Sequence, residues 1–198
     1  MLLLKRWTGF FKRDVSDLYH TIKVRAPRDY FNRADAFIED IIYTTHEELQ
    51  GINKTFLVKL LFENFLDHVR RGKDMYDYVV NLRETYSTTL VTVNRLNLPN
   101  TSLVPKFQWS LSNKSGKTER SDYLTLNIKL HPREVNRIQV LFSDLDWKYD
   151  HPLDMELNEL LSLLFIEFIT ELRNGLDNET KDEIVASILN KWEKNNRV

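Results

Sequence analysis

Two short segments of the chain carry polar side chains at every second position. They are residues 21–26 and residues 125–130, and they start 104 positions apart. Alternation with a period of two predicts β-strands, and it turns the polar side chains of each strand to one face. The polar members are Thr21, Lys23, Arg25, Thr125, Asn127 and Lys129.

These side-chain types are the ones that read base edges in the major groove of duplex DNA. Arg or Lys can bridge O6 and N7 of guanine, Asn can pair with adenine, and Thr can donate to a base or touch a thymine methyl group. The groove also admits a two-stranded ribbon. We therefore expect all six residues to contact bases, although the same residue types suit any strand that faces solvent.

The opposite face of both segments is apolar. Its members are Ile22, Val24, Ala26, Leu126, Ile128 and Leu130. A strand with one apolar face must cover that face with other elements. We therefore expect the two strands to pair side by side above a shared helical core, with their polar faces turned outward.

The likeness between the two halves continues past the strands. Residues 32–33 align with residues 136–137 at the same offset. After a one-residue deletion, residues 57–65 align with residues 160–168, and a short segment ending in Gly72 aligns with one ending in Gly175. A strand and two amphipathic helices in the same order and register indicate an internal repeat.

Each copy is predicted to hold two helices after its strand. A proline near the end of each strand suits the opening turn of the first helix, where a missing N–H costs nothing. Asn53 and Asp154 are expected to cap the second helix. Gly72 and Gly175 stand where a left-handed residue commonly ends a helix.

The order of strand, helix and helix, with an alternating strand, resembles the ribbon-helix-helix family, the Arc, MetJ and CopG type of DNA-binding protein. The resemblance covers residues 20–74 and 122–176, and it corresponds to a tandem, single-chain form of the family. It implies an antiparallel ribbon in the major groove and four intertwined helices. The expected fold class is mainly α with a small β-ribbon (α+β), in which two repeats form an intramolecular pseudo-dimer.

The resemblance also implies a phosphate contact at the start of the second helix, where backbone N–H groups and the helix dipole attract anions. Asn53, Lys54 and Thr55 fit this role in the first copy. Residues 154–156 of the second copy include two acidic side chains, which would repel a phosphate. We expect either an asymmetric footprint or a second copy kept mainly for folding.

The expected organisation has five parts. They are a basic and aromatic N-terminal arm (1–19), a first repeat (20–75), an inserted linker with β character (76–121), a second repeat (122–176) and a C-terminal helix (177–198). The residue pattern predicts two strands within the linker, at residues 88–93 and 107–111. If residues 107–111 paired with residues 123–129 as a hairpin, either the ribbon would not form or the sheet would have more strands.

The two ends of the chain add amphipathic segments. Residues 1–13 mix apolar and aromatic side chains with four cations. Packing on the protein itself is favoured for this arm, with a DNA-phosphate contact or a membrane-surface helix as alternatives. Asn178 can cap a helix that carries Ile184, Ile188 and Trp192 on one side, which predicts a packing or oligomer-contact element.

Composition and charge limit the classes of function. Cysteine is absent, so the chain has no disulfide and no thiolate metal site. The five histidines lack metal-ligand spacing and no Gly-rich phosphate loop occurs, so we expect no cofactor, no metal, no catalytic residue and no enzyme. The net charge is −1, but residues 1–33 hold eight Lys or Arg against three Asp, whereas acidic residues predominate from residue 144 onward. The asymmetry predicts a basic working face.

These patterns predict a sequence-specific double-stranded DNA-binding protein, either a transcription regulator or a plasmid or phage accessory factor in partition or relaxosome assembly. Self-association on repeated DNA sites stays open. A cytoplasmic location without a membrane partner is expected, because no apolar run approaches the roughly 20 residues that span a bilayer. The alternative is a non-enzymatic protein-interaction module of a phage or plasmid, which would bind a protein partner through its acidic C-terminal half.

Overall fold

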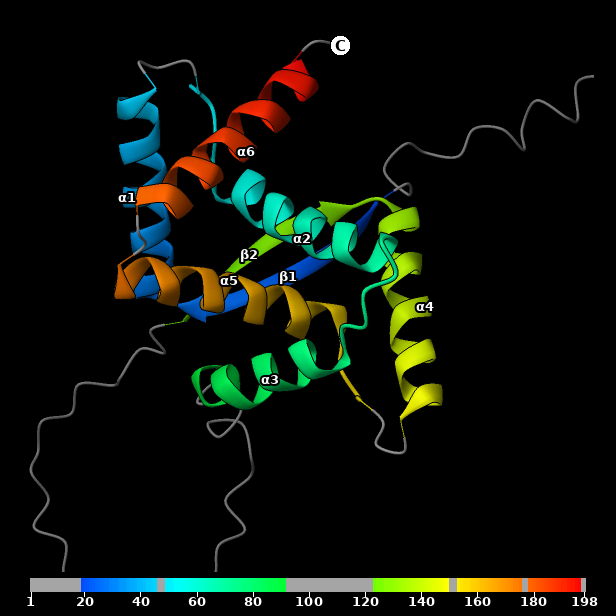
Figure 1. The fold of residues 1–198 in the computed structure, drawn as a ribbon. Helices are drawn as coiled ribbons and strands as arrows, with labels where there is room; N and C mark the ends of the chain where they lie inside the picture. Colours follow the sequence, from blue (N-terminus) through cyan, green and yellow to red (C-terminus); the bar gives the residue numbers. More distant parts are fainter. Residues whose placement is uncertain (1–18, 46–48, 92–122, 150–152, 176–177, 197–198) are drawn as a thin grey trace, which may run out of the picture.

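The computed structural model describes residues 19–45, 49–91, 123–149, 153–175 and 178–196, and these residues form six helices and two strands (Figure 1). The elements are β1 (His20–Pro27), α1 (Arg28–Thr44), α2 (Lys54–Arg70), α3 (Tyr76–Val91), β2 (Tyr123–Leu130), α4 (Pro132–Lys148), α5 (Leu157–Asn174) and α6 (Asn178–Asn196). The predicted class, mainly α with a small β component, is confirmed.

The two strands pair with each other, as their shared pattern predicted. They run antiparallel, from His20 opposite Leu130 to Pro27 opposite Tyr123. Within the described residues the sheet contains these two strands alone. The alternative hairpin partner, residues 107–111, lies outside the described residues. The ribbon is therefore built from segments about a hundred positions apart in the chain.

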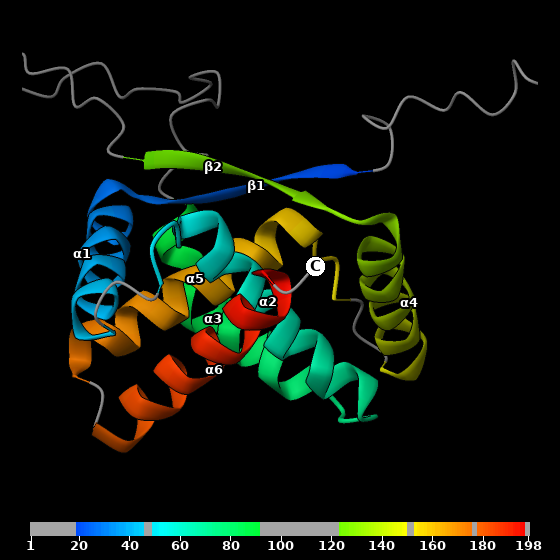
Figure 2. The ribbon, with the colours of Figure 1, turned by 90° about the horizontal axis from the view of Figure 1, so that it is seen from above.

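The ribbon covers one side of a helical layer. All labelled helices lie on the same side of β1 and β2 (Figure 2). Val24, Ala26, Ile128 and Leu130 point into the helical layer and are buried. Because burying a Val, Leu or Ile side chain contributes about 1.5–3 kcal/mol, these positions fix which face of the ribbon turns inward.

The order of strand, helix and helix occurs twice in space as well as along the chain. α1 and α4 leave opposite ends of the ribbon, and α2 and α5 cross between them (Figures 1 and 2). α5 is buried over most of its length. At the centre the rings of Phe31 and Phe165 lie 5.0 Å apart, and Phe62 is fully buried.

Residues 76–91 correct the prediction of a β-type linker. They form helix α3, in which Val79 and Leu82 are buried. Asp74 accepts a hydrogen bond from the N–H of Tyr76 at 3.0 Å and so begins the helix. β-branched residues near Val91 favour a strand only weakly, and packing of α3 against α5 outweighs that preference. The rest of the linker, residues 92–121, lies outside the described residues.

A third helix follows the second in both halves, and each packs on the second helix of the other half. α3 contacts α5, as described below. α6 contacts α2, where the ring of Trp192 meets that of Phe56 edge to face at 5.5 Å and Lys191 pairs with Glu63. The C-terminal helix predicted from Asn178 is confirmed as a packing element, with Ile188 buried.

Helix boundaries follow the predicted residues with one exception. Asn53 caps α2 by accepting a hydrogen bond from the N–H of Phe56 at 3.0 Å. Gly72 and Gly175 both have positive φ, +73° and +89°, as expected for left-handed residues after helices. Asp154 does not cap α5. It lies before the cap position, which Glu156 takes without a side-chain hydrogen bond.

Candidate nucleic-acid interface

The six side chains predicted to contact bases all lie on the outer face of the ribbon. The antiparallel register places Thr21 opposite Lys129, Lys23 opposite Asn127, and Arg25 opposite Thr125. All six residues are exposed, while their neighbours on β1 are buried. Directly opposed side chains on a ribbon lie about 5 Å apart at Cβ, so the six make one continuous polar strip.

The size of this strip suits a DNA groove. Eight residues per strand give a ribbon about 26 Å long, at roughly 3.3 Å per residue. A major groove about 12 Å wide accepts two strands side by side. Since every labelled helix lies behind the ribbon, no described helix blocks its outer face (Figure 2).

Among the described residues, no acidic side chain pairs with the cations of the strip. Lys23, Arg25 and Lys129 take part in none of the ion pairs found among the described residues. The strip itself contains no Asp or Glu. Three unpaired positive charges on a narrow surface attract a polyanion, even though the net charge of the chain is −1.

Two side chains of α5 hold the ribbon in place from one edge. The N–H of Lys23 donates to Asn158 Oδ1, and the N–H of Arg25 donates to Ser162 Oγ, each at 2.9 Å. Ser162 also donates to the carbonyl of Asn158 at 2.6 Å. In an antiparallel pair every second N–H of a strand points away from its partner, so these bonds satisfy donors that β2 does not reach. The backbone beneath the two β1 cations is thereby fixed.

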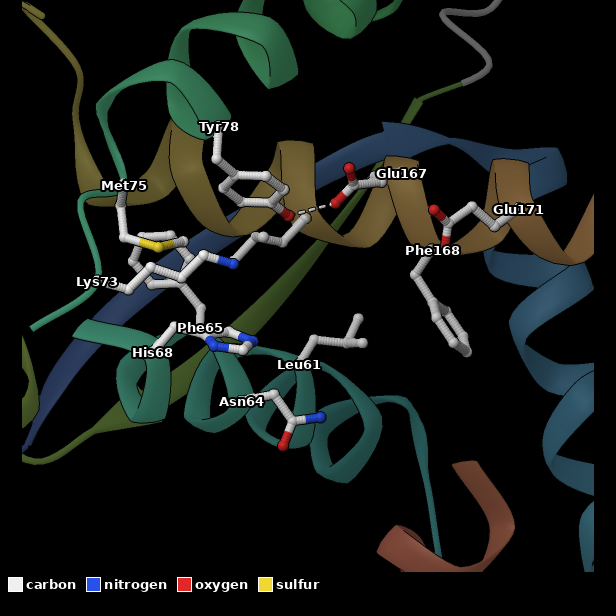
Figure 3. Close-up of a pocket in the computed structure, with 11 residues that line it drawn as sticks. Leu61, Asn64, Phe65, His68, Lys73, Met75, Tyr78, Glu167, Phe168 and Glu171 are labelled. Carbon is white, nitrogen blue, oxygen red and sulfur yellow. Dashed lines mark hydrogen bonds between the residues drawn. The ribbon is translucent and has the colours of Figure 1, made fainter. Parts of the chain in front are cut away.

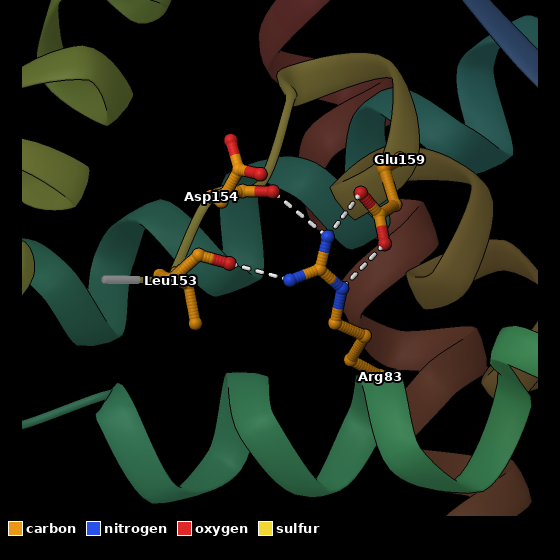
Figure 4. Close-up of polar contacts among 4 residues, drawn as sticks. All are labelled: Arg83, Leu153, Asp154 and Glu159. Carbon is orange, nitrogen blue, oxygen red and sulfur yellow. Dashed lines mark hydrogen bonds and ion pairs between the residues drawn. The ribbon is translucent and has the colours of Figure 1, made fainter. Parts of the chain in front are cut away.

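Arg83 of α3 fixes the start of α5. Its guanidinium donates to both carboxylate oxygens of Glu159, at 2.8 and 3.0 Å. It also donates to the carbonyls of Leu153 and Asp154 (Figure 4). A planar guanidinium can serve several acceptors at once. α3 therefore positions the same helix whose first turns hold β1.

The predicted phosphate site at the start of α2 is already partly occupied. Asn53 accepts the N–H of Phe56, which leaves the N–H groups of Lys54 and Thr55 as the remaining donors of that turn. Lys54 Nζ lies 2.6 and 2.7 Å from the two carboxylate oxygens of Asp35. This ion pair offsets the positive charge that sequence reasoning assigned to the site.

The start of α5 has the acidic character predicted for the second copy. Asp154 and Glu156 are both exposed, and Glu159 is bound to Arg83. A cation pairs with an acid at the start of α2, whereas acids predominate at the start of α5. The two helix starts therefore differ in charge.

Sequence reasoning missed the residues that support the strip. Ser162 is a lone polar residue in an otherwise apolar stretch of α5, and it is 2% exposed. A single polar residue among apolar ones could have indicated this supporting role, because a buried hydroxyl needs a hydrogen-bond partner. The ion pair of Lys54 with Asp35 joins α2 to α1 and had no signal in the pattern.

The described residues contain no group of three His, Asp or Glu side chains placed to hold a metal ion. No helix built from them has both the length and the apolar composition needed to cross a bilayer. Comparison of the chain with protein-family models, with curated proteins and with solved structures finds no match.

Proposed function

We propose that this chain is a sequence-specific double-stranded DNA-binding protein that inserts the β1–β2 ribbon into the major groove. The observation that carries the proposal is the register of the two strands, which gathers Thr21, Lys23, Arg25, Thr125, Asn127 and Lys129 on one exposed face. The proposal includes a ribbon-helix-helix pseudo-dimer within a single chain, formed by the two strand-helix-helix units.

A pseudo-dimer explains why both units are needed. One strand alone lacks a partner, and α2 and α5 each bury apolar side chains against the opposite unit. Joining two units in one polypeptide makes folding independent of protein concentration. The outward-facing side chains of the two strands differ, with Lys23 and Arg25 on β1 and Asn127 and Lys129 on β2. The DNA site is therefore expected to be an imperfect palindrome.

The biological role belongs to the proposal too. A DNA reader without a catalytic step fits a cytoplasmic transcription regulator or a plasmid or phage accessory factor. Backbone contacts are expected mainly from the first unit, through the N–H groups of Lys54 and Thr55 beside the cap residue Asn53. The second unit has acidic residues at the matching place.

The test compares two double variants on duplex DNA. A duplex recovered by selection from a random pool is labelled, and affinity is measured by fluorescence anisotropy over a range of salt concentrations. Lys23→Ala/Arg25→Ala removes two cations from the strip. Arg71→Ala/Arg173→Ala removes two exposed cations from the far ends of α2 and α5 and is the matched control.

The ribbon variant is expected to bind at least about thirtyfold more weakly, from a lower bound of about 1 kcal/mol for each base contact. The control should keep most of its affinity, and both should melt at the wild-type temperature because all four residues are exposed. Wild-type affinity should fall as salt rises, since binding releases counterions. Equal losses of affinity in the two variants, or no binding of the wild type to any duplex, would contradict the proposal.

One observation favours the second candidate function, a protein-interaction module. Trp147 is 90% exposed and lies beside Asp144 and Asp146, in the acidic half of the chain. Exposed aromatic side chains are typical anchors of protein interfaces. If the protein fails to bind duplex DNA at low salt, Trp147→Ala should be used next, and loss of a captured partner would support this candidate.

A further inference from the structure

A pocket lies between α2, α3 and α5 (Figure 3). Its volume is about 230 Å³. Phe65 and Phe168 provide apolar walls, and Tyr78 closes one side. The walls come from both units, because Phe65 belongs to α2 and Phe168 to α5.

Two carboxylates of α5 line the same pocket. Glu167 is half-buried and accepts a hydrogen bond from the Tyr78 hydroxyl at 2.5 Å. Glu171 follows one helical turn later and also lines the pocket. Like charges four residues apart on a helix repel each other. Burial, together with the charge of Glu171, raises the pKa of Glu167 above its ordinary value, although the Tyr78 hydrogen bond lowers it.

These carboxylates have no cation bound to them in the described part of the chain. None of its ion pairs includes Glu167 or Glu171. Lys73 reaches toward the middle of the pocket in Figure 3 without forming such a pair. The pocket thus joins two carboxylates to aromatic walls, and its two basic lining residues, Lys73 and His68, form no ion pair with either carboxylate among the described residues.

Aromatic faces and carboxylates together form a binding site for organic cations. The rings of Phe65 and Tyr78 lie 6.2 Å apart and are inclined by 35°. An ammonium group is attracted by the faces of such rings and by carboxylates. A neutral apolar molecule would gain nothing from Glu167 and Glu171, and an anion would be repelled by them.

We propose that this pocket binds a small organic ammonium ion with an aromatic or other apolar body, its ammonium group beside Glu167 and Glu171 and its body against Phe65 and Phe168. The volume suits one aromatic ring with a short amine chain. Because the ligand touches α2 and α5, it stabilises the packing of one unit on the other. Binding to the folded state alone raises the melting temperature as ligand concentration rises.

The test uses three probes of one shape and different charge: 2-phenylethylammonium, 2-phenylethanol and 3-phenylpropionate. Affinity is measured by calorimetry and by the shift in melting temperature, with the full chain and without DNA. The ammonium probe is expected to bind one site saturably and more tightly than the alcohol, with the carboxylate weakest. No saturable binding of the ammonium probe, or equal binding of the alcohol, would overturn the proposal.

Three variants locate the site. Glu167→Gln keeps an acceptor for Tyr78 and removes the charge, so it should weaken binding of the ammonium probe about tenfold or more. Glu84→Gln removes an exposed carboxylate of α3 outside the pocket and should leave affinity unchanged. Lys73→Gln removes the competing cation and should bind at least as tightly as wild type. Equal losses in the two Glu variants, or weaker binding by Lys73→Gln, would refute the assignment.

Discussion

Replacing Ser162 by alanine tests how the ribbon is held on its helical support. The Ser162 hydroxyl accepts the N–H of Arg25 at 2.9 Å and donates to the carbonyl of Asn158 at 2.6 Å. With alanine the helix keeps its own hydrogen bonds, but the N–H of Arg25 loses its acceptor. The site is almost fully covered, with Ser162 2% exposed, so water cannot readily replace the hydroxyl.

The expected magnitude comes from two opposing contributions. A buried donor left without a partner costs about 1–3 kcal/mol. Alanine is a better helix former than serine, which returns roughly 0.5 kcal/mol. The free energy of unfolding should therefore fall by about 0.5–2.5 kcal/mol.

The assay is urea denaturation of wild type, Ser162→Ala and the control Ser143→Ala. Ser143 lies on the exposed face of α4, and its hydroxyl donates to the carbonyl of Gln139 in the same helix at 2.9 Å. Both substitutions remove a serine hydroxyl from the interior of a helix, but only Ser162 supports a strand. Ser143→Ala should be neutral or slightly stabilising.

Hydrogen exchange adds a local readout to the same pair of variants. The amide of Arg25 should exchange faster in Ser162→Ala and unchanged in Ser143→Ala. Equal stabilities of the two variants, with unaltered exchange at Arg25, would refute the idea that α5 pins the edge of β1.

Three further predictions concern charged groups. Hydrogen bonds from a lysine, a tyrosine and a backbone N–H hold the pKa of Asp74 at about 2, below its ordinary 3.8. The ionised Asp74 carboxylate therefore stabilises the fold fully above about pH 4, and this contribution is lost as the pH falls through about 2. Asp74→Asn should therefore be less stable than wild type in denaturation experiments at neutral pH, and the difference should narrow as the pH falls and vanish below about pH 2. Arg83→Lys should lower the free energy of unfolding by about 1–2 kcal/mol because an ammonium group cannot bind all four acceptors, whereas Arg70→Lys, in an exposed pair, should change it little. Asp35→Asn releases Lys54 from its ion pair and should tighten DNA binding in anisotropy measurements, and weaker binding would argue against a phosphate contact there.

The ribbon could be predicted from sequence because its physical signal is local and occurs twice. Ile22, Val24 and Ala26 alternate with polar residues, and the same alternation around Ile128 gave the strand a partner of matching length. One buried face then determines which side chains turn outward. The pairing between distant strands followed from the matching order of elements in the two halves.

Features that depend on packing between elements could not be predicted from the sequence. Residues 88–91 favour a strand by composition, yet they form the end of helix α3, which packs against α5. The pairing of Lys54 with Asp35 depends on how α1 and α2 lie against each other. The support of β1 by Ser162 depends on the position of α5 beneath the ribbon. Each involves residues separated along the chain and joined only by the fold.

The most direct test of the central claim is a map of backbone amide chemical shifts on titration with a selected duplex. Shifts are expected to concentrate on residues 21–25 and 125–129, with smaller changes at the start of α2. A scrambled duplex of equal length should produce smaller and more uniform changes. If the duplex instead perturbs α3 or α6 and leaves both strands unchanged, the ribbon does not contact DNA and the proposed function is wrong.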